Sequence, residues 1–305
     1  MNRMLWLVRR EVWEHKAIWI APLIVLGCLA LSMFFSRIHL GPDIEIDGLS
    51  PLAGLPQEKL ARLVMIAYAG LTVVVFAVMG IISFFYSLDA LYSDRRDRSV
   101  LFWKSLPLSD AETVLSKFAV ACVVIPLVAL VAAVLAQFVV AGVASARLAI
   151  GGTSAGLLWH PQAVLGGLVV ALLAAVTAAF WYAPVVAYLM LASSWAPRGP
   201  FLWAVLPPVA LIVIERVLFY TDYVGDFIGA RLFGLARVLE RPDGPDVDPQ
   251  TNAEVQAEVA RVADMNLVGN LLDFFRSAEL WLGVVAAGIL LAAAIWVRRY
   301  RDETT

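Results

Sequence analysis

One short stretch of the sequence contains residue types that could carry hydrolytic chemistry. Gly152–Gly156 reads GTSAG, the G-x-S-x-G pattern in which a serine can act as a nucleophile, and His160 follows closely. That chemistry requires a strand-to-helix elbow and an acid partner, whereas this stretch is a small, glycine-rich connection between apolar runs. A flexible turn is therefore favoured, and a membrane hydrolase that uses Ser154 and His160 is kept as an alternative hypothesis.

Candidate metal and nucleotide ligands do not assemble into a recognisable site. Asp43–Gly48 reads DIEIDG, like the start of a calcium loop, but the twelfth position, which needs a glutamate, is Gly54. The sequence also has no G-x-x-x-x-G-K-[ST] pattern for binding ATP through a P-loop. The three histidines lie on different segments and lack zinc spacing; they are His15, His39 and His160. These patterns predict no catalytic, metal or cofactor site on this chain.

The composition indicates a membrane protein instead. Hydrophobic residues make up 61% of the 305 residues and charged residues only 16%, whereas soluble domains carry about 25% charged residues. The net charge of −2 argues against nucleic acid as a partner. Cys28 and Cys122 both fall in apolar runs, where cysteine usually packs as a small hydrophobic residue rather than forming a disulfide.

Six apolar stretches are long enough to cross a bilayer as helices, which takes about 20 residues each. They cover residues 17–36, 61–88, 117–141, 163–192, 200–220 and 277–297. Helices are expected because lipid offers no partner for unpaired backbone groups. The first run is longer than the ~7–15-residue core of a signal peptide, so it is read as a retained span. The predicted fold class is an all-α polytopic membrane protein that forms one domain over residues 1–305.

Basic residues indicate the orientation of these spans, because short cytoplasmic connections are enriched in Lys and Arg. The basic residues on the predicted cytoplasmic side are Arg3, Arg9, Arg10, Lys16, Arg95, Arg96, Arg98, Lys104, Lys117, Arg298, Arg299 and Arg301. The short connections on the other side hold only Arg37, Lys59 and Arg147, with Arg62 at a helix mouth. Both termini are therefore predicted to be cytoplasmic.

Two segments outside the spans have helical patterns. Residues 1–16 place Met4, Leu5, Val8 and Val12 on one face, which predicts an amphipathic elbow helix in the inner interface; an ordinary charged leader is the alternative. Residues 221–276 repeat apolar residues at helical spacing on both sides of a proline-rich acidic run. They predict an external helical region between spans five and six, with two helices that cap the outer mouth.

Charged residues and prolines inside the spans are further candidates. Glu215 and Arg216 close the fifth span. They either pair locally at the outer interface or line the outer part of a translocation path, and the first reading is favoured. Pro126, Pro184 and the pair Pro207–Pro208 remove backbone donors from spans, so helix kinks are expected there.

The connection between spans two and three, residues 89–116, differs from every other connection. Its stretch DRRDRSVLFWKSLPLSD, Asp94 to Asp110, combines basic residues with apolar ones. Four apolar residues are presented together in this stretch: Leu101, Phe102, Trp103 and Leu106. The first three lie between Arg98 and Lys104, and Leu106 follows shortly after. Exposed apolar groups with a polar rim mark contact surfaces. The alternative is a topology anchor, but charge alone would serve that purpose.

A predicted helix start lies at the end of this connection. Ser109 and Glu112 in SDAE form a predicted capping box, so the third span is expected to begin as a helix at Ser109, about two turns before the bilayer. Pro107 sets a corner before it. The result is a short cytoplasmic helix held at an angle to two long ones, which suits pushing by a soluble partner.

The segment LYSDRRDRSVLFWKSLPLSDAETVLSKF, preceded by the N-terminal RREVWEHK, resembles the permease subunits of bacterial ABC-2 type exporters. The order of an elbow helix, a coupling helix between spans two and three and an external helical region is similar as well. The resemblance implies a transport subunit and no enzyme, located in the bacterial inner membrane. It implies a second permease copy, identical or paralogous, and two separate ATP-binding subunits that hold ATP and Mg.

The resemblance also implies where the ATPase would bind. Carried over position by position, the coupling contacts fall on Arg95, Arg96, Asp97, Arg98, Ser99, Phe102, Trp103 and Lys104. It does not fix a substrate, since family members move drugs, peptides, lipids, glycans and ions. A regulatory subunit without its own pathway remains a further alternative.

Overall fold

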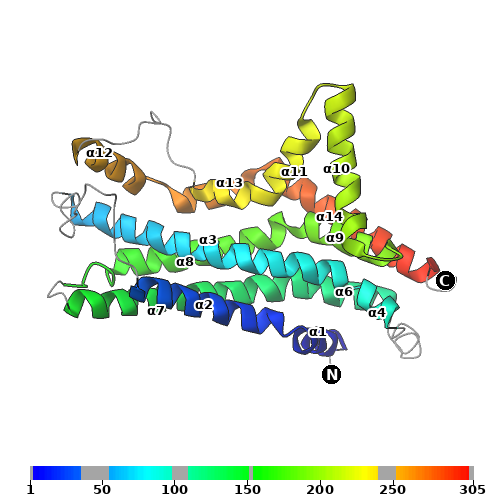
Figure 1. Ribbon diagram of the computed structural model, residues 1–305, viewed down its shortest axis with the longest axis horizontal. Helices are drawn as coiled ribbons and strands as arrows, with labels where there is room; N and C mark the ends of the chain where they lie inside the picture. The colour runs from blue at the N-terminus through cyan, green and yellow to red at the C-terminus, as the bar shows by residue number, and fades with distance from the viewer. Residues whose placement is uncertain (1–2, 36–54, 98–108, 151–153, 240–251, 302–305) are drawn as a thin grey trace.

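The computed structural model describes residues 3–35, 55–97, 109–150, 154–239 and 252–301, and these ranges contain helices and no strand (Figure 1). The helices are α1 (Arg3–Glu14), α2 (Ala17–Phe35), α3 (Gln57–Asp89), α4 (Tyr92–Arg96), α6 (Asp110–Ala119), the π-helical turn η1 (Val120–Val124), α7 (Ile125–Ile150), α8 (Pro161–Trp181), α9 (Ala183–Trp195), α10 (Pro200–Leu218), α11 (Tyr223–Phe233), the 3₁₀ helix η2 (Gly234–Leu239), α12 (Asn252–Ala263), α13 (Leu267–Arg276) and α14 (Ala278–Arg301).

Within the described ranges, six helical stretches are long and apolar enough to span a membrane, the number predicted from hydropathy. They are Ala17–Phe35, Gln57–Arg96, Asp110–Ile150, Pro161–Trp181, Pro200–Leu218 and Ala278–Tyr300. Several extend well beyond the predicted apolar cores, because polar turns continue the helices at their ends. α1 is a separate helix before α2, as predicted; its position at a membrane interface stays a prediction.

The centre of the bundle is the pair α3 and α7, which lie side by side (Figure 1). α2 packs on α7, α8 and α9 pack on α3, and α14 packs along α9. Alanines on α7, including Ala129, Ala133 and Ala136, are almost fully buried in this core, and such small residues allow membrane helices to approach closely. Gly167 of α8 serves the same purpose, because a Cβ there would lie 3.1 Å from the Tyr68 side chain.

The fourth predicted span, 163–192, is two helices in the structure. α8 ends at Trp181 and α9 begins at Ala183, with Tyr182 between them. Pro184 lies in the first turn of α9, where its missing N–H costs least. The expected kink at Pro184 is therefore confirmed. α9 has only 13 residues, a length of about 20 Å, which is too short to cross a bilayer alone.

Pro126 has a different effect on the third span. A proline lacks the N–H that would bond to the carbonyl four residues earlier, here Cys122. The five residues before Ile125 form the π-helical turn η1, in which the Ile125 N–H donates to the Val120 carbonyl. The helix thus continues through the proline with a local π turn. At Pro207 and Pro208, by contrast, α10 continues as an α-helix.

The region between spans five and six differs from the expected pair of capping helices. It contains α11, η2, α12 and α13, and its acidic run, 240–251, lies outside the described residues. α13 lies along the flank of α8, away from the ends of the bundle (Figure 1), and buries Leu267 and Leu271 against Val170 and Ala174. The apolar spacing that predicted helices here therefore reflects packing against the side of the bundle.

Arg231 of α11 joins this region to the break between α8 and α9. Its buried guanidinium donates to the Trp181 carbonyl at 3.3 Å and to the Glu279 carbonyl. It also lies over the Trp181 ring, 4.2 Å from the ring centroid. Burial lowers the pKa of Arg231 from its usual range because desolvation penalises the charged form, yet a guanidinium stays protonated at any ordinary pH. One cation thus holds α8, α11 and α14 together.

Replacing Arg231 should destabilise the fold. Arg231→Met keeps much of the apolar stem and leaves the Trp181 and Glu279 carbonyls without these donors, at about 1–3 kcal/mol for each unsatisfied group. We expect the thermal midpoint of the detergent-solubilised chain to fall by roughly 5 °C or more. Arg276→Met is the control, because Arg276 is 80% exposed and its ion pair, 3.1 Å long, is with Asp273 in the same helix. Equal midpoints for the two variants would contradict the assigned role.

Candidate functional site

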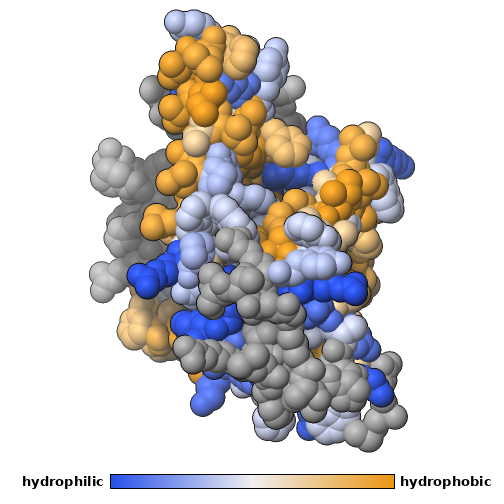
Figure 2. Space-filling model, turned by 90° about the vertical axis from the view of Figure 1, so that its right-hand side faces the viewer, coloured by the Kyte–Doolittle hydropathy of each residue, from blue (hydrophilic) through white to orange (hydrophobic). Residues whose placement is uncertain are grey.

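The end of the bundle that carries α4 also carries both chain termini (Figure 1). Viewed from this end, hydrophilic residues gather over the centre and lower part of the surface, while hydrophobic residues cover the projecting part at the top (Figure 2). α4 follows α3 after a tight corner, and Ser193 of α9 holds that corner. Its Oγ accepts the N–H groups of Leu91 and Tyr92 at 3.1 and 2.9 Å.

Arg95 of α4 reinforces the same contact. Its guanidinium donates to the carbonyls of Ser193 at 2.6 Å and Ala196 at 2.9 Å, where the C-terminus of α9 presents carbonyl groups and the negative end of its dipole. Arg96 instead is exposed and pairs with Asp97 at 3.0 Å. Two adjacent arginines therefore face opposite ways: Arg95 faces the bundle and Arg96 faces outward.

These two arginines and Asp97 are the described members of the predicted coupling set. The others lie outside the described residues: Arg98, Ser99, Phe102, Trp103 and Lys104. The capping box just after them is confirmed, since the Ser109 N–H donates to Glu112 Oε2 at 2.8 Å and the Glu112 N–H donates to Ser109 Oγ at 3.2 Å. α6 therefore begins where the sequence predicted, immediately after the coupling segment.

Beside α4 lies a chain of buried ion pairs, which we call the charge network. Its members are Glu11 of α1, Asp94 of α4, Asp110 and Lys117 of α6, and Arg298 of α14. Lys117 Nζ lies 2.8 Å from Glu11 Oε1 and 3.5 Å from Asp94 Oδ1. Arg298 Nη1 lies 3.1 Å from Asp94 Oδ2, and its Nε lies 3.3 Å from Asp110 Oδ1.

All members except Asp110 are almost fully buried, with exposed fractions of 3–6%. Tyr86 of α3 adds a hydroxyl that donates to Glu11 Oε2 at 3.2 Å. Desolvation of a buried ion costs several kcal/mol, which only a close opposite charge and further hydrogen bonds offset. The four helices α1, α4, α6 and α14 can therefore move relative to one another only if buried charges lose their partners or move with them.

Sequence reasoning did not single out this network. Lys117 and Arg298 served only as topology markers, and Glu11 was not singled out. The structure buries Leu7, Glu11 and Val12 of α1 within the protein and leaves Leu5 67% exposed. One signal was available: Lys117 lies seven residues after Asp110, two helical turns along the same face.

Glu215 and Arg216 take the local role that sequence analysis favoured. Glu215 accepts the Thr221 hydroxyl at 2.9 Å and the N–H groups of Tyr223 and Val224 at 2.9 and 2.8 Å. It therefore caps the start of α11. Arg216 is 74% exposed, with its Nε 3.6 Å from Asp222 Oδ1. Both charges thus have local partners at the turn between α10 and α11, and a role in a translocation path stays a hypothesis.

The possible hydrolytic pair lacks a matching geometry. Ser154 Oγ accepts the Gly156 N–H at 3.3 Å within a turn, and His160 directly precedes α8. Within the described part of the chain, no hydrogen bond joins Ser154 to His160, and no group of three or more His, Cys, Asp or Glu could hold a metal ion. Asp43–Gly48 and His39 lie outside that part. Cys28 and Cys122 are free cysteines.

The described residues hold six span-capable helical stretches, and buried ion pairs join three of these stretches and α1 at one end. These features define a multi-pass α-helical membrane protein. Residues 60–193 match the family described as ABC-2 family transporter protein. The matched region runs from α3 to α9, and it therefore includes α4, the coupling segment and the start of α6. No curated protein and no solved structure matches the chain.

The family match confirms the resemblance to ABC-2 permeases and identifies the matched region as an ABC-2 transporter membrane domain. It supports a transmembrane permease of an ABC transporter, which is a transport component and not itself an enzyme. The family also implies association with an ABC ATP-binding subunit.

Loss of one charge of the Lys117–Glu11 pair should destabilise the fold more than loss of both charges. Lys117→Met leaves Glu11 buried without its cation, and breaking a buried pair in this way costs about 3–5 kcal/mol. The double variant Glu11→Gln, Lys117→Met removes both charges and should recover part of that loss. We expect the thermal midpoint of the double variant in detergent to lie above that of Lys117→Met.

The exposed pair Arg10–Glu14, whose side chains are 36% and 46% exposed, provides the control. Arg10→Met should change the midpoint little, because surface pairs contribute about 0–1 kcal/mol. A double variant less stable than Lys117→Met would show that the two charges do not depend on each other.

Proposed function

We propose that this chain is the permease subunit of an ABC exporter, forming the translocation pathway and coupling it to ATP hydrolysis on a separate subunit. The ATPase docks on the segment 89–116 and contacts Arg96, Asp97, Arg98, Ser99, Phe102, Trp103 and Lys104. The family match over residues 60–193 supports the transport class. The exposed position of Arg96 and Asp97 supports docking at this segment.

The charge network is the single observation that carries the coupling proposal. Asp94 belongs to α4, directly before the docking residues, and it pairs with Lys117 and Arg298. A displacement of α4 by the ATPase would therefore act on α6 and α14 at once, and on α1 through Glu11. Buried pairs transmit such a displacement well, because separating them leaves charges without partners.

Arg95 has another role in this proposal. It was carried over as a contact to the ATPase, but its guanidinium donates to the C-terminal carbonyls of α9. In that position Arg95 holds the α3–α4 corner against α9. It makes the docking surface rigid and adds no contact to the partner itself.

The proposed assembly rests on the resemblance to ABC-2 permeases. We propose two ATP-binding subunits, which hold ATP and Mg, and a second permease copy that is identical or paralogous. The chain lies in a bacterial inner membrane with both termini cytoplasmic. The concentration of basic residues at the α4 end, where both termini lie (Figure 1), supports this orientation.

Arg96 and Arg95 provide a matched pair for testing the docking surface. Arg96→Glu should lower the amount of ATP-binding subunit that co-purifies in mild detergent at least fivefold, because it reverses a charge on the exposed face. Its thermal midpoint should stay within about 1 °C of the parent. Arg95→Ala should lower the midpoint instead, because it removes the donor to the Ser193 and Ala196 carbonyls at the C-terminus of α9. Unchanged co-purification of Arg96→Glu would contradict docking at this surface.

Coupling itself is tested further along the segment. Changing Arg98 and Trp103 together to alanine should abolish substrate-stimulated ATP turnover in the reconstituted complex while the thermal midpoint stays unchanged. Normal coupled transport in this double variant would refute the coupling role.

The alternative functions have their own tests. Ser154→Ala should leave transport intact, whereas labelling of Ser154 by an activated-serine probe would favour the hydrolase. An ATPase that no transported compound stimulates would favour the regulatory subunit.

A further inference from the structure

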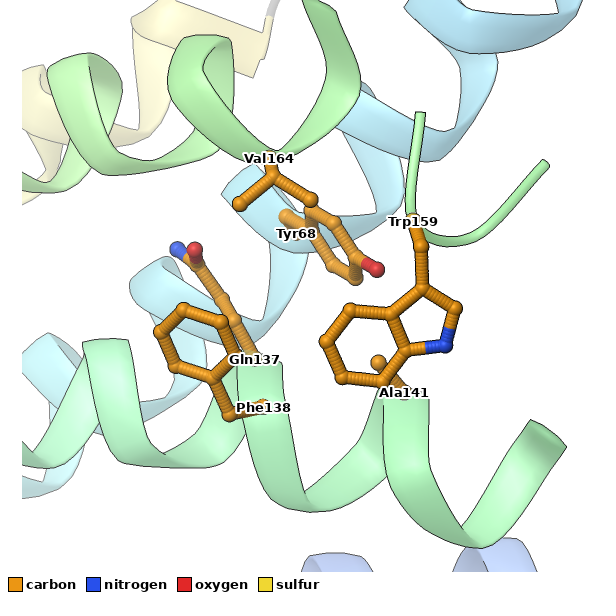
Figure 3. A pocket seen from close by; sticks show the side chains of 6 residues that line it. All are labelled: Tyr68, Gln137, Phe138, Ala141, Trp159 and Val164. Carbon is orange, nitrogen blue, oxygen red and sulfur yellow. The ribbon is translucent and has the colours of Figure 1, made fainter. Parts of the chain in front are cut away.

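The enclosed space between α3, α7 and α8 is too small for an organic ligand. It has room for about one water molecule (Figure 3). Its lining residues are Tyr68, Gln137, Phe138, Ala141, Trp159 and Val164. A larger surface lies on the outside of the chain, where α1 combines a positive charge with two aromatic rings.

Four exposed residues share the side of α1 that faces away from the bundle, and we call this side the outward face: Leu5, Trp6, Arg9 and Trp13. Their spacing places them on one stripe of the helix, and Trp6 and Trp13 are 52% and 70% exposed. The other side is held to the bundle by Glu11, whose Oε1 lies 2.8 Å from Lys117 Nζ. Two large rings thus project from a helix that a buried ion pair fixes in place.

The direction of α1 and its level along the bundle match those of lipid head groups. In Figure 1 α1 is seen nearly end-on, while α2 extends across the view, so α1 runs crosswise to the spans. It packs against α6 and η1 of the third span. Its partner there, Lys117, precedes residues 118–146, which include no charged residue. α1 therefore lies along the membrane plane, at the level where the third span becomes apolar and the head groups begin.

The outward face also adjoins the exposed apolar surface of α2. Only His15 and Lys16 separate the two helices, and Trp19 and Ile20 at the start of α2 are 50% and 51% exposed. Tryptophan is enriched at membrane–water interfaces, because its amphipathic ring fits the head-group level. The lipid leaflet that surrounds the start of α2 therefore also reaches the outward face of α1.

Arg9 supplies the charge of this face. Its guanidinium carbon lies 5.5 Å from the ring centroid of Trp6 and 5.5 Å from that of Trp13. Both rings attract the cation and hold it between them. A guanidinium presents N–H donors in a flat fork that matches the oxygens of a phosphate.

Neither acidic residue of α1 neutralises this charge. Glu11 pairs with Lys117, and Glu14 pairs with Arg10 at 2.7 Å. Within the part of the chain that the structure describes, Arg9 has no ion pair. The outward face is therefore positive and aromatic, which complements a negatively charged head group at the end of an apolar chain.

We propose that the outward face of α1 binds an anionic phospholipid from the leaflet at the α4 end. Arg9 donates to the phosphate oxygens, and Trp6 and Trp13 lie beside the glycerol and the first part of the acyl chains. A zwitterionic lipid binds more weakly, because its own ammonium group offsets the phosphate charge. This site goes beyond the transport proposal, since the chain alone binds the lipid without ATP or an ATPase.

The proposal is tested by native mass spectrometry of the purified full chain in detergent, titrated with dioleoylphosphatidylglycerol or dioleoylphosphatidylcholine. The two lipids have the same acyl chains and differ in the net charge of the head group. We expect the first phosphatidylglycerol to bind about fivefold more tightly than the first phosphatidylcholine, because a basic side chain at a membrane surface favours anionic lipid by that order.

Two variants of the same helix locate the site. Arg9→Gln removes the charge of the outward face, and it should weaken phosphatidylglycerol binding about fivefold while phosphatidylcholine binding stays unchanged. Arg10→Gln is the matched control, because it removes the same charge from the neighbouring position, where Arg10 pairs with Glu14. It should bind phosphatidylglycerol like the parent. Both variants should keep the thermal midpoint of the parent within about 2 °C, since neither side chain is buried.

Several results would overturn the proposal. Equal binding of the two lipids by the parent would remove the preference for anionic lipid. Equal weakening by Arg9→Gln and Arg10→Gln would show a general attraction to basic residues and no site on the outward face. If Arg9→Gln kept its phosphatidylglycerol affinity but lost co-purifying ATP-binding subunit, this face would bind protein instead of lipid. The lipid titration needs no ATPase, so this proposal and the transport proposal can fail separately.

Discussion

A charged side chain that is buried among apolar helices needs an opposite charge or hydrogen-bond partners, because the low dielectric of its surroundings does not otherwise compensate for lost hydration. Lys117 and Arg298 meet this condition only through Glu11, Asp94 and Asp110. These residues come from the first helix, the last helix and the two helices that flank the coupling segment. The positions of α1, α4, α6 and α14 are therefore set together, and the docking surface takes its rigidity from all four.

Irregular points in the spans are accompanied by adjusted hydrogen bonds. Directly before Pro126 the helix forms a π turn, in which the Ile125 N–H donates to the Val120 carbonyl. At the α8–α9 break, the Trp181 carbonyl accepts from Arg231 instead. Because Arg231 also binds the Glu279 carbonyl, this compensation fixes the start of α14. Local defects in the spans thus become contacts between distant segments.

The structural features that depend on neighbouring residues along the chain could be predicted from the sequence. The six apolar runs identified six span-capable helices, and the capping box at Ser109 and Glu112 predicted the start of α6, because both signals lie within a few residues. The charge network depends on pairs that are 106 residues apart for Lys117 and Glu11 and 204 apart for Arg298 and Asp94. No local pattern distinguishes these residues from ordinary cytoplasmic charges.

Other misses have the same origin. The helical spacing of 252–276 is correct for α12 and α13, but it does not reveal that α13 lies along α8. Gln137 was read as part of an apolar span, because its partners Thr72 and Gly167 lie on other helices. Arg95 and Arg96 look alike in sequence, and only the corner between α3 and α4 turns one toward α9 and the other outward.

The π turn relates the charge network to the buried amide of Gln137, which donates to Thr72 Oγ1 at 3.2 Å. The helix that contains α6, η1 and α7 carries Lys117 on one side of this turn and Gln137 on the other. Each residue along a helix rotates the following side chains by about 100°, so the extra residue of a π turn sets the angle between Lys117 and Gln137. With a regular α-helix through Pro126, one of the two would point away from its partners, Glu11 or Thr72. The π turn before Pro126 is therefore what allows a single helix to contribute both the Lys117 and the Gln137 contacts.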